Sequence, residues 1–498
     1  MTTEHRHADL AALAERDPHR PAYHFVAPGG WLNDPNGVCQ WDGVFHLFYQ
    51  YNPAGPVHDR IHWGHASSAD LMHWRDEPIA LAPSAGPDTE GCWSGVLVND
   101  GGTPTLVYSG HAPSQYSTQT CCVATGTADL RHWTKHPGNP VIPGPPDGLD
   151  VTELRDHTVW REDGHWHQAM GSGLVGHGGA LLHFSGADLR SWDYLGPLLT
   201  ADDLPHGGPF SGNTWECPDL FPLGPDGTWV LVFSAWDHGR TLYPLYLTGR
   251  LSDGRFHPGA HPRHLDVGLR HFYAPQSFAA DDGRRIQFGW AQEARPDAEV
   301  LQAGWSGVMS LPRTLDLQPD GTLVAAPVAE LDVLRSSSEE RVEIASGAVR
   351  TRTAGDQLDL NADLVLPPGG SVEVAIRATE DLQEATFVRI ERSHDGVARL
   401  IVDRSRSRNA PDAGSYDLCD LGGALPALTN DRLTLRILVD HSIVEVFAAG
   451  VPLTARIYPA SPDATGVHVA VDGAGARVSL SAWEMRGTQR ASSAAAAA

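Results

Sequence analysis

A repeat of about 60 residues runs through the first 300 positions of this chain and restricts the folds open to it. Three near-identical segments, ADLMHW at 69–74, ADLRHW at 128–133 and ADLRSW at 187–192, follow one another at intervals of 59 residues. A second element, a glycine followed by a strand-like run, begins at Gly43, Gly102, Gly164, Gly227 and Gly283. A repeat of this length indicates an array of similar supersecondary units rather than one irregular core.

The glycine-led copies are rich in β-branched and aromatic residues and are bounded by Gly, Asp or Pro, which is typical of short antiparallel strands. A unit of this length has room for a four-stranded sheet with long loops. Five such sheets arranged radially form a β-propeller. A large β-sandwich with accidental similarity is the alternative, and the agreement of five registers favours the propeller.

Polar residues recur seven to eleven positions upstream of each repeat strand. The upstream segments are WLNDPNG (31–37), CWSGV (92–96), LRDHTVW (154–160), WECPDLF (215–221) and YAPQSF (273–278). We expect them to be the innermost strands of the blades, which converge on the central channel. Their polar members are Asn33, Asp34, Ser94, Arg155, Asp156, Glu216 and Gln276.

Tryptophans surround these polar residues along the chain, namely Trp31, Trp63, Trp93, Trp160, Trp215 and Trp290. Polar groups hydrogen-bond hydroxyls, whereas aromatic faces cover the C–H surface of a sugar ring. The combination of three carboxylates, one arginine and aromatic platforms therefore predicts a neutral, polyhydroxylated ligand.

The motifs WLNDPNG, FYQYNP (48–53), WGHA (63–66), WSG (93–95), an Arg-Asp pair and WECPDLF together resemble glycoside hydrolase family 32, the invertase, inulinase and levanase group. The resemblance implies an all-β fold, a five-bladed β-propeller followed by a C-terminal β-sandwich. One departure is visible, because the family usually reads Arg-Asp-Pro and here His157 follows Asp156. The guanidinium and the carboxylate are kept, so only the rigidity of that turn is in question.

The resemblance also implies a retaining hydrolysis of β-D-fructofuranosyl linkages through a covalent fructosyl-enzyme intermediate. Asp34 would attack the anomeric carbon, and Glu216 would protonate the leaving oxygen and later activate water. Asp156 would bind fructose hydroxyls, with Arg155 orienting the carboxylates. The same subsite would be lined by Asn33, Gln50, Trp63, Trp93, Ser94 and Trp290. No metal or organic cofactor is expected, and we expect Glu216 to be protonated and Asp34 to be ionised at neutral pH.

Other interpretations of the function remain open from the sequence. An inverting propeller glycosidase acting on arabinan or xylan would use a similar three-acid channel, and a non-catalytic sugar-binding propeller would keep the fold. Within the family, a fructan-degrading exo-enzyme and a fructosyltransferase share the active site. Loops around the mouth decide between sucrose, its 6-phosphate, levan and inulin.

The repeat and the composition of the remaining chain divide it into five parts. We expect an N-terminal extension with a short amphipathic helix (1–20), the propeller (21–325), a linker (326–344), a sandwich of alternating strands (345–486) and a disordered tail (487–498). Every candidate polar site lies in the propeller, so the sandwich is expected to support it rather than to perform chemistry.

Composition excludes several function classes. The net charge of −25 argues against nucleic acid or an anionic membrane surface as a partner. There is no apolar run long enough to span a membrane and no signal-peptide core, and the six cysteines have no framework spacing. We therefore expect a cytoplasmic protein whose partner is a small or oligomeric fructoside. GxGxxG at 171–176 is followed by a strand-like run instead of a helix, so we do not expect a dinucleotide-binding site there. No HExxH zinc motif and no GxSxG motif of serine hydrolases occurs.

Overall fold

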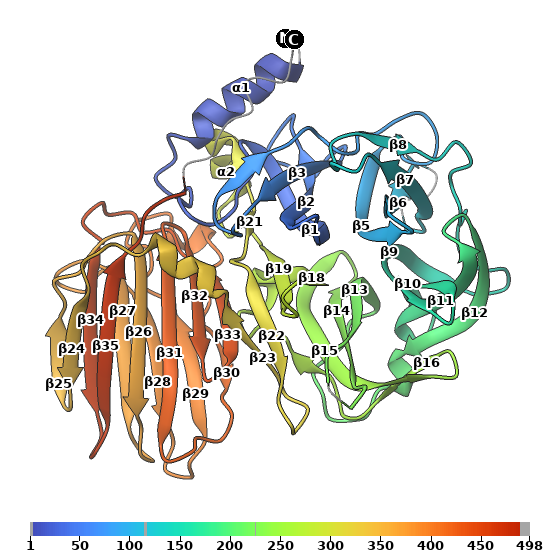
Figure 1. The fold of residues 1–498 in the computed structure, drawn as a ribbon. Helices are drawn as coiled ribbons and strands as arrows, with labels where there is room; N and C mark the ends of the chain where they lie inside the picture. The colour runs from blue at the N-terminus through green and yellow to red at the C-terminus, as the bar shows by residue number, and fades with distance from the viewer. Residues whose placement is uncertain (1–2, 114–116, 225, 489–498) are drawn as a thin grey trace.

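The computed structural model describes residues 3–113, 117–224 and 226–488, which form two β-rich units side by side (Figure 1). The first unit is a ring of five sheets, and the second is a stack of two six-stranded sheets. This is the five-bladed β-propeller followed by a β-sandwich that the sequence predicts.

Each blade starts with one of the polar segments singled out above, and its strands then run outward in chain order. The strands of blade one are β1 (Gly30–Trp41), β2 (Val44–Asn52), β3 (His62–Ser68) and β4 (Trp74–Asp76). Those of blade two are β5 (Gly91–Asp100), β6 (Thr103–His111), β7 (Thr120–Gly126) and β8 (Trp133–Lys135). Those of blade three are β9 (Val151–Glu162), β10 (His165–Leu174), β11 (Gly178–Asp188) and β12 (Ser191–Thr200).

The last two blades carry additional short strands. Blade four consists of β13 (Thr214–Pro222), β14 (Trp229–Asp237), β15 (Arg240–Ser252), β16 (Arg255–Pro258) and β17 (Arg263–His264). Blade five consists of β18 (Tyr273–Ala279), β19 (Arg285–Ala291), β21 (Val308–Met309), β22 (Arg313–Leu317) and β23 (Leu323–Pro327). The first strands of neighbouring blades contact each other all the way round, and β18 contacts β1 to close the ring.

The repeated sequence elements have the same structure in each copy. Gly43, Gly102, Gly164, Gly227 and Gly283 all have positive φ and lie in the tight turn between the first and second strands, a conformation that glycine adopts without strain. In the ADL-W segments, the indole N–H of Trp74, Trp133 and Trp192 donates to the carbonyl oxygen of the leucine three residues before it. The period found in the sequence is therefore one blade.

Short strand β20 (Trp305–Ser306) ties the two ends of the propeller together. It follows helix α2 (Asp297–Ala303) in blade five and pairs in parallel with the start of β1, so that Gly30 lies opposite Trp305. Met309 of β21 also donates its backbone N–H to the carbonyl oxygen of Phe25. The ring is therefore closed by hydrogen bonds between segments that are distant in sequence.

The sandwich packs two sheets over one apolar core. One sheet has the order β24 (Glu340–Ile344), β35 (Arg477–Glu484), β26 (Gln357–Val365), β31 (Arg432–Asp440), β32 (Ile443–Ala448) and β33 (Val451–Arg456). The other has the order β25 (Gly347–Arg350), β34 (Gly466–Asp472), β27 (Ser371–Ala378), β28 (Thr386–Arg392), β29 (Ala398–Asp403) and β30 (Leu421–Ala424). Alternate residues of β26, from Leu358 to Leu364, face this core, as the period of a strand requires.

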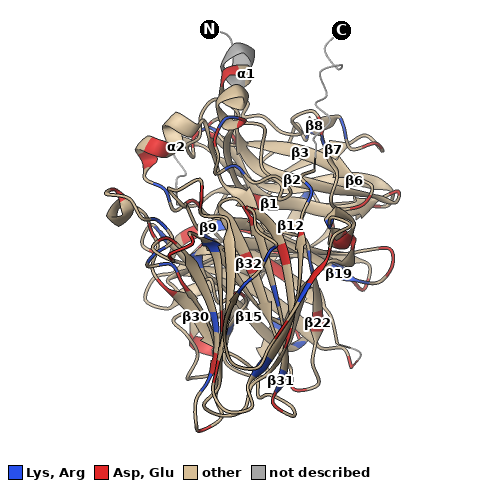
Figure 2. Ribbon diagram, turned by 90° about the vertical axis from the view of Figure 1, so that its left-hand side faces the viewer, with Lys and Arg blue, Asp and Glu red and all other residues tan. Residues whose placement is uncertain are grey.

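Charged residues of both signs are interspersed along the strands of the sandwich (Figure 2). Some pair across neighbouring strands, as Arg389 of β28 does with Glu373 of β27. In the part of the chain that the structure describes, no helix combines the length and the apolarity needed to cross a membrane.

A buried ionic cluster joins the propeller to the sandwich. Arg313 of β22 contacts Glu445 of β32 (Nη2–Oε2 2.6 Å) and Asp266 (Nη1–Oδ2 2.7 Å), and all three side chains are essentially inaccessible. His24 bridges the same Glu445 to Asp440 of β31. A buried charge needs a partner, so these contacts bind the two units to each other.

The stretch predicted as a linker, 326–344, is structured. It holds the end of β23, the 3₁₀ helix η4 (Ala329–Leu334) and β24, which pairs with β35 and thus belongs to the sandwich. In the predicted N-terminal extension, α1 spans Thr3–Ala14. Of the predicted tail, 489–498 lies outside the described residues. Further 3₁₀ helices in the described part of the chain are η2 (Ala201–Asp203), η3 (Leu269–His271) and η5 (Ala413–Ser415).

Candidate active site

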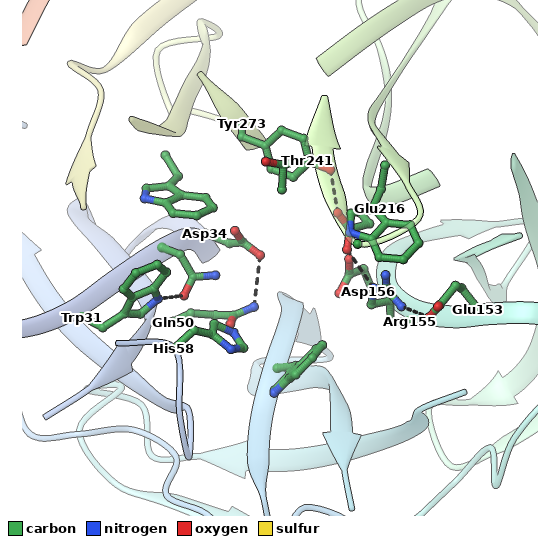
Figure 3. Close-up of a pocket in the computed structure, with 15 residues that line it drawn as sticks. Trp31, Asp34, Gln50, His58, Glu153, Arg155, Asp156, Glu216, Thr241 and Tyr273 are labelled. Atoms are coloured by element: carbon green, nitrogen blue, oxygen red, sulfur yellow. Dashed lines mark hydrogen bonds and ion pairs between the residues drawn. The ribbon is translucent and has the colours of Figure 1, made fainter. Parts of the chain in front are cut away.

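A cavity of about 490 Å³ opens on the propeller, and all five blades contribute to its wall (Figure 3). Its lining is acidic and aromatic. The lining residues are Trp31, Asn33, Asp34, Gln50, His58, Trp93, Glu153, Arg155, Asp156, Glu216, Trp236, Gly239, Thr241, Tyr273 and Trp290.

A β-bulge interrupts the first strand of every blade at the level of this cavity. The ladder register shifts between Leu32 and Pro35, Cys92 and Gly95, Arg155 and His157, Glu216 and Asp219, and Tyr273 and Gln276. A bulge re-aims side chains that a regular strand would direct to one of the two faces of the sheet. The residues released from the ladder include Asn33, Asp34, Ser94 and Asp156, and Glu216 lies at the edge of its bulge. The five bulges thus bring together side chains that are far apart in sequence.

One position of the repeat supports the bulge of the next blade. It is the seventh residue after the turn glycine, occupied by Gln50, Ser109, Gly171, Ser234 and Trp290. Ser109 Oγ accepts the backbone N–H of Asp156 (2.8 Å), and Ser234 Oγ accepts that of Ala274 (3.0 Å). A Cβ on Gly171 would lie 2.3 Å from the carbonyl oxygen of Trp215, so only glycine fits beside Glu216.

Asp34 is a buried carboxylate that accepts hydrogen bonds from neighbouring side chains. Its Oδ2 accepts from Ser94 Oγ (2.6 Å) and from Gln50 Nε2 (3.0 Å). Burial, together with the negative charge of Glu216, raises the pKa of Asp34 to about 6 despite these hydrogen bonds. Arg155 does not pair with Asp34, because its guanidinium forms ion pairs with Glu153 and Glu216.

Asp156 lies at the bulge of β9 with φ at 61°, in the left-handed region. Its Oδ2 accepts the backbone N–H of Cys217 (2.9 Å), and the Cys217 thiol lies 3.3 Å from the same oxygen and 3.5 Å from Asp34 Oδ2. Burial and the charge of Glu216 raise the pKa of Asp156 to about 7. The acidic cluster therefore retains a proton close to neutral pH, shared between interacting sites.

Glu216 is held by two donors on its two oxygens. Arg155 Nε donates to Oε1 (2.8 Å), and Tyr273 Oη donates to Oε2 (2.6 Å). Arg155 forms a second ion pair with Glu153, and its guanidinium lies over the ring of Trp236, 5.1 Å from the ring centroid. Burial and the charge of Glu216 raise the pKa of Tyr273 well above its usual range, so its hydroxyl remains a donor.

The structure brings most of the predicted site residues together. Those that line the cavity are Asn33, Asp34, Gln50, Trp93, Arg155, Asp156, Glu216 and Trp290. Ser94 lies just behind them, where it contacts both Asp34 and Gln50.

Other residues singled out in the sequence do not line the cavity. Trp63 is fully buried in the core of its blade, and its indole N–H donates to the carbonyl oxygen of Trp93 (3.0 Å), so it supports a lining residue from behind. Gln276 connects blades, because it accepts from the backbone N–H of Val38 and donates to the carbonyl oxygen of Gly95. Trp160 and Trp215 are also core residues. Trp63 lies on β3, the third strand of its blade and not the inner one, which the spacing of the motifs does not show.

Several lining residues are not predicted from the sequence as site residues, namely His58, Glu153, Trp236, Gly239, Thr241 and Tyr273. A signal existed for two of them. Tyr273 begins the polar segment of blade five, and Trp236 lies two residues after the supporting Ser234 of the repeat. His58 lies in the loop between β2 and β3, where the repeat carries no pattern.

Two polar atoms at the cavity are buried and have no hydrogen-bond partner among the described residues. They are Gln50 Oε1, an acceptor, and Trp290 Nε1, a donor. Such groups are costly unless something binds to them, so they are suited to ligand hydroxyls. Within the same described residues, no group of three or more His, Cys, Asp or Glu side chains is arranged to hold a metal ion.

Comparison with known families gives a match over nearly the whole chain. The glycosyl hydrolases family 32 N-terminal domain matches residues 24–327, and the family 32 C-terminal domain matches residues 330–484.

Individual proteins show the same relationship. The chain is 33% identical to a fructan 6-exohydrolase from Beta vulgaris, over 97% of this chain and 89% of that protein. It is 33% identical to a sucrose-6-phosphate hydrolase from Escherichia coli, over 92% and 94% of the two chains. The crystal structure of fructan 1-exohydrolase IIa from Cichorium intybus superposes with a TM-score of 0.85 at 28% identity, covering 96% of this chain and 99% of that one.

Proposed function

This chain belongs to glycosyl hydrolase family 32, and from that membership and the geometry of the channel we propose that it hydrolyses β-D-fructofuranosyl bonds with retention of configuration. The observation that supports this most directly is the meeting of Asp34 and Glu216 in one cavity, although they come from the non-adjacent blades one and four (Figure 3). Each carboxylate has its own set of donors, so the two can take different roles.

In the first step, Asp34 attacks the anomeric carbon of the fructosyl group while the bond to the leaving oxygen breaks. Glu216 gives its proton to that oxygen, and a covalent fructosyl-enzyme results. The step needs one proton on Glu216 and an ionised Asp34. The acidic cluster holds a proton near neutral pH, as the raised pKa values of Asp34 and Asp156 indicate.

In the second step, Glu216, now ionised, accepts a proton from water, and the water oxygen attacks the same carbon to displace Asp34. Both carboxyl groups return to their starting states. Arg155 and Tyr273 hold Glu216 through its two oxygens, which keeps it at one place for both proton transfers.

Asp156 binds hydroxyls of the fructosyl ring and stabilises the positive charge that develops on it. Asn33 and the free acceptor Gln50 Oε1 serve the same ring, and the indole N–H of Trp290 donates to it. Trp31, Trp93 and Trp236 provide aromatic faces for the C–H surfaces of the sugar.

The substrate is sucrose or a related fructoside. The names of the relatives favour two further candidates of the same chemistry, since one is a fructan exohydrolase and another acts on the 6-phosphate of sucrose. For the location, we infer the cytoplasm, because the six cysteines are all free thiols.

Release of fructose from sucrose, sucrose 6-phosphate, inulin and levan tests this proposal. We expect at least one of the four to be hydrolysed, with no added cofactor, and the variant Asp34→Asn to lose that activity. Fructose appearing first as the β anomer in the NMR spectrum supports retention, whereas the α anomer would support the inverting alternative. If the protein binds all four sugars and hydrolyses none of them, the result supports the alternative of a non-catalytic sugar-binding propeller.

A further inference from the structure

His157 is buried directly behind the channel and joins two blades. It follows Asp156 in β9 and is 1% exposed. One ring nitrogen, Nδ1, lies 3.0 Å from Gln168 Oε1 on β10 of the same blade. The other, Nε2, lies 3.2 Å from Ser109 Oγ on β6 of the preceding blade.

His157 contacts Gln168, Ser109 and the backbone of Tyr108, and we assign its proton from the contact with Gln168. Gln168 Oε1 can only accept, so Nδ1 carries the hydrogen, and burial holds the pKa of His157 at about 4, so the ring is neutral. Nε2 is therefore an acceptor, and the Ser109 hydroxyl donates to it. A Ser109 hydroxyl oriented in this way points a lone pair at the backbone N–H of Asp156, which donates to Ser109 Oγ (2.8 Å).

The backbone of Asp156 needs such an anchor. Its neighbours Arg155 and His157 pair with Gly171 and Met170 of β10, so the bulge leaves Asp156 without a ladder partner. Its positive φ of 61° is uncommon for a residue other than glycine and persists only where the surroundings enforce it. Asp156 is held by the hydrogen bond from its N–H to Ser109 and by those from the N–H and the thiol of Cys217 to its carboxylate.

We propose that His157 is a positioning residue, which acts through Ser109 to hold the Asp156 carboxylate in the channel. The chain runs from Gln168 through His157 and Ser109 to the backbone of Asp156, and none of the first three lines the cavity. This inference rests on the proposed function, since it takes Asp156 as the group that binds the fructosyl ring.

The test compares His157→Leu, which removes both ring nitrogens, with His157→Gln, whose amide keeps one donor and one acceptor. The assay is kcat/KM per folded enzyme on the fructoside that the unchanged enzyme hydrolyses fastest. We expect His157→Leu to lower kcat/KM about tenfold, the value of one net hydrogen bond. His157→Gln should recover most of the loss.

A double-mutant cycle with Ser109→Ala separates this route from general loosening of the blade. If His157 acts through Ser109, Ser109→Ala causes a similar loss, and adding His157→Leu to it lowers kcat/KM no further. Losses that multiply would overturn the proposal. The matched control is His183→Leu, which removes another buried histidine of blade three, away from the cavity. An equal loss of kcat/KM in this control would also overturn it.

A crystal structure of His157→Leu tests the inference without any substrate. We expect Ser109 Oγ to turn away from the Asp156 N–H and the Asp156 carboxylate to shift, and an unchanged hydrogen bond and φ would contradict the proposal. If the unchanged enzyme hydrolyses no fructoside, the proposed function fails on that result alone, and this structure decides the role of His157.

Discussion

At the scale of single residues, burial decides how the carboxyl groups of the channel hold their protons. The sequence places apolar neighbours beside Glu216 and a polar turn around Asp34, which suggests that Asp34 is the more easily ionised. In the structure, Glu216 has Arg155 and Tyr273 as partners, whereas burial raises the pKa of Asp34 to about 6. Neighbours in sequence are a poor guide here, because the groups that contact a propeller channel come from other blades.

The first prediction concerns the acid limb of the pH profile. Attack requires ionised Asp34, so kcat/KM should fall as the pH drops through about 6. Part of that raised pKa comes from the charge of Glu216, so Glu216→Gln should move the acid limb to lower pH. The measurement uses an activated fructoside, whose leaving group needs no proton. An acid limb that stays in place would show that Asp34 does not set it.

The second prediction separates the roles of the two carboxylates. Asp34→Asn keeps the shape of the side chain but removes the attacking charge, so kcat should fall by several orders of magnitude while affinity for substrate changes little. Glu216→Ala should spare the first step for an activated fructoside, and azide should then restore turnover by replacing the missing base. The product is identified by NMR as a fructosyl azide of retained configuration. An inverted azide, or near-normal turnover by Asp34→Asn, would support the inverting mechanism instead.

At the scale of strands, the site depends on the bulges more than on the strands themselves. The repeat in the sequence predicts the inner strands and the residues that converge, because period and order along the chain determine both. It does not predict which tryptophans reach the channel. Trp93 and Trp63 belong to neighbouring motifs, yet one lines the cavity and the other lies in the blade core. Trp93 lies in the bulge of the first strand β5, whereas Trp63 lies on β3, the regular third strand of its blade, and the spacing of the motifs shows neither position.

The third prediction tests the glycine that supports the bulge of blade four. A Cβ at residue 171 would lie 2.3 Å from the carbonyl oxygen of Trp215 and 2.8 Å from that of Arg155, so Gly171→Ala must displace the backbone that carries Glu216 and Arg155. We expect kcat/KM to fall at least tenfold, because catalytic groups tolerate only small displacements. Gly144→Ala is the control, since its Cβ would meet nothing within 4 Å and its φ is not positive. Equal activity of the two variants would show that the bulge adapts.

At the scale of the whole molecule, the sequence predicts the two units but not how they are joined. Five repeats and a run of alternating strands are sufficient for a propeller and a sandwich, because both follow from local periodicity. The junction depends instead on single charged residues, such as Arg313 and Glu445, that lie 132 positions apart. Nothing in the composition around either residue distinguishes it from a surface charge. For the same reason the 326–344 stretch, which reads as a linker, contains a strand that pairs only in the folded sandwich.

The last prediction concerns that junction and the proposed supporting role of the sandwich. Arg313 is buried with Asp266 and Glu445. Burial alone would raise the pKa of Glu445, but the charge of Arg313 and the hydrogen bond with His24 lower it to about 2, so the acid is ionised. Arg313→Met leaves two buried carboxylates without their guanidinium, which should lower the free energy of unfolding by about 3–5 kcal/mol. Arg341→Met, at an exposed ion pair on the sandwich, should change it by less than about 1 kcal/mol.

Denaturant unfolding and kcat/KM per folded molecule, measured on both variants, distinguish support from chemistry. We expect Arg313→Met to unfold at lower denaturant with kcat/KM nearly unchanged, because every residue that lines the cavity belongs to the propeller. Removing the chain after residue 335 should destabilise the protein more than Arg313→Met does. Arg313 and His24 then lose their sandwich partners and an apolar face is exposed, so we expect aggregation. A soluble truncated propeller that binds fructose normally but does not turn over its substrate would show instead that the sandwich supplies a catalytic group.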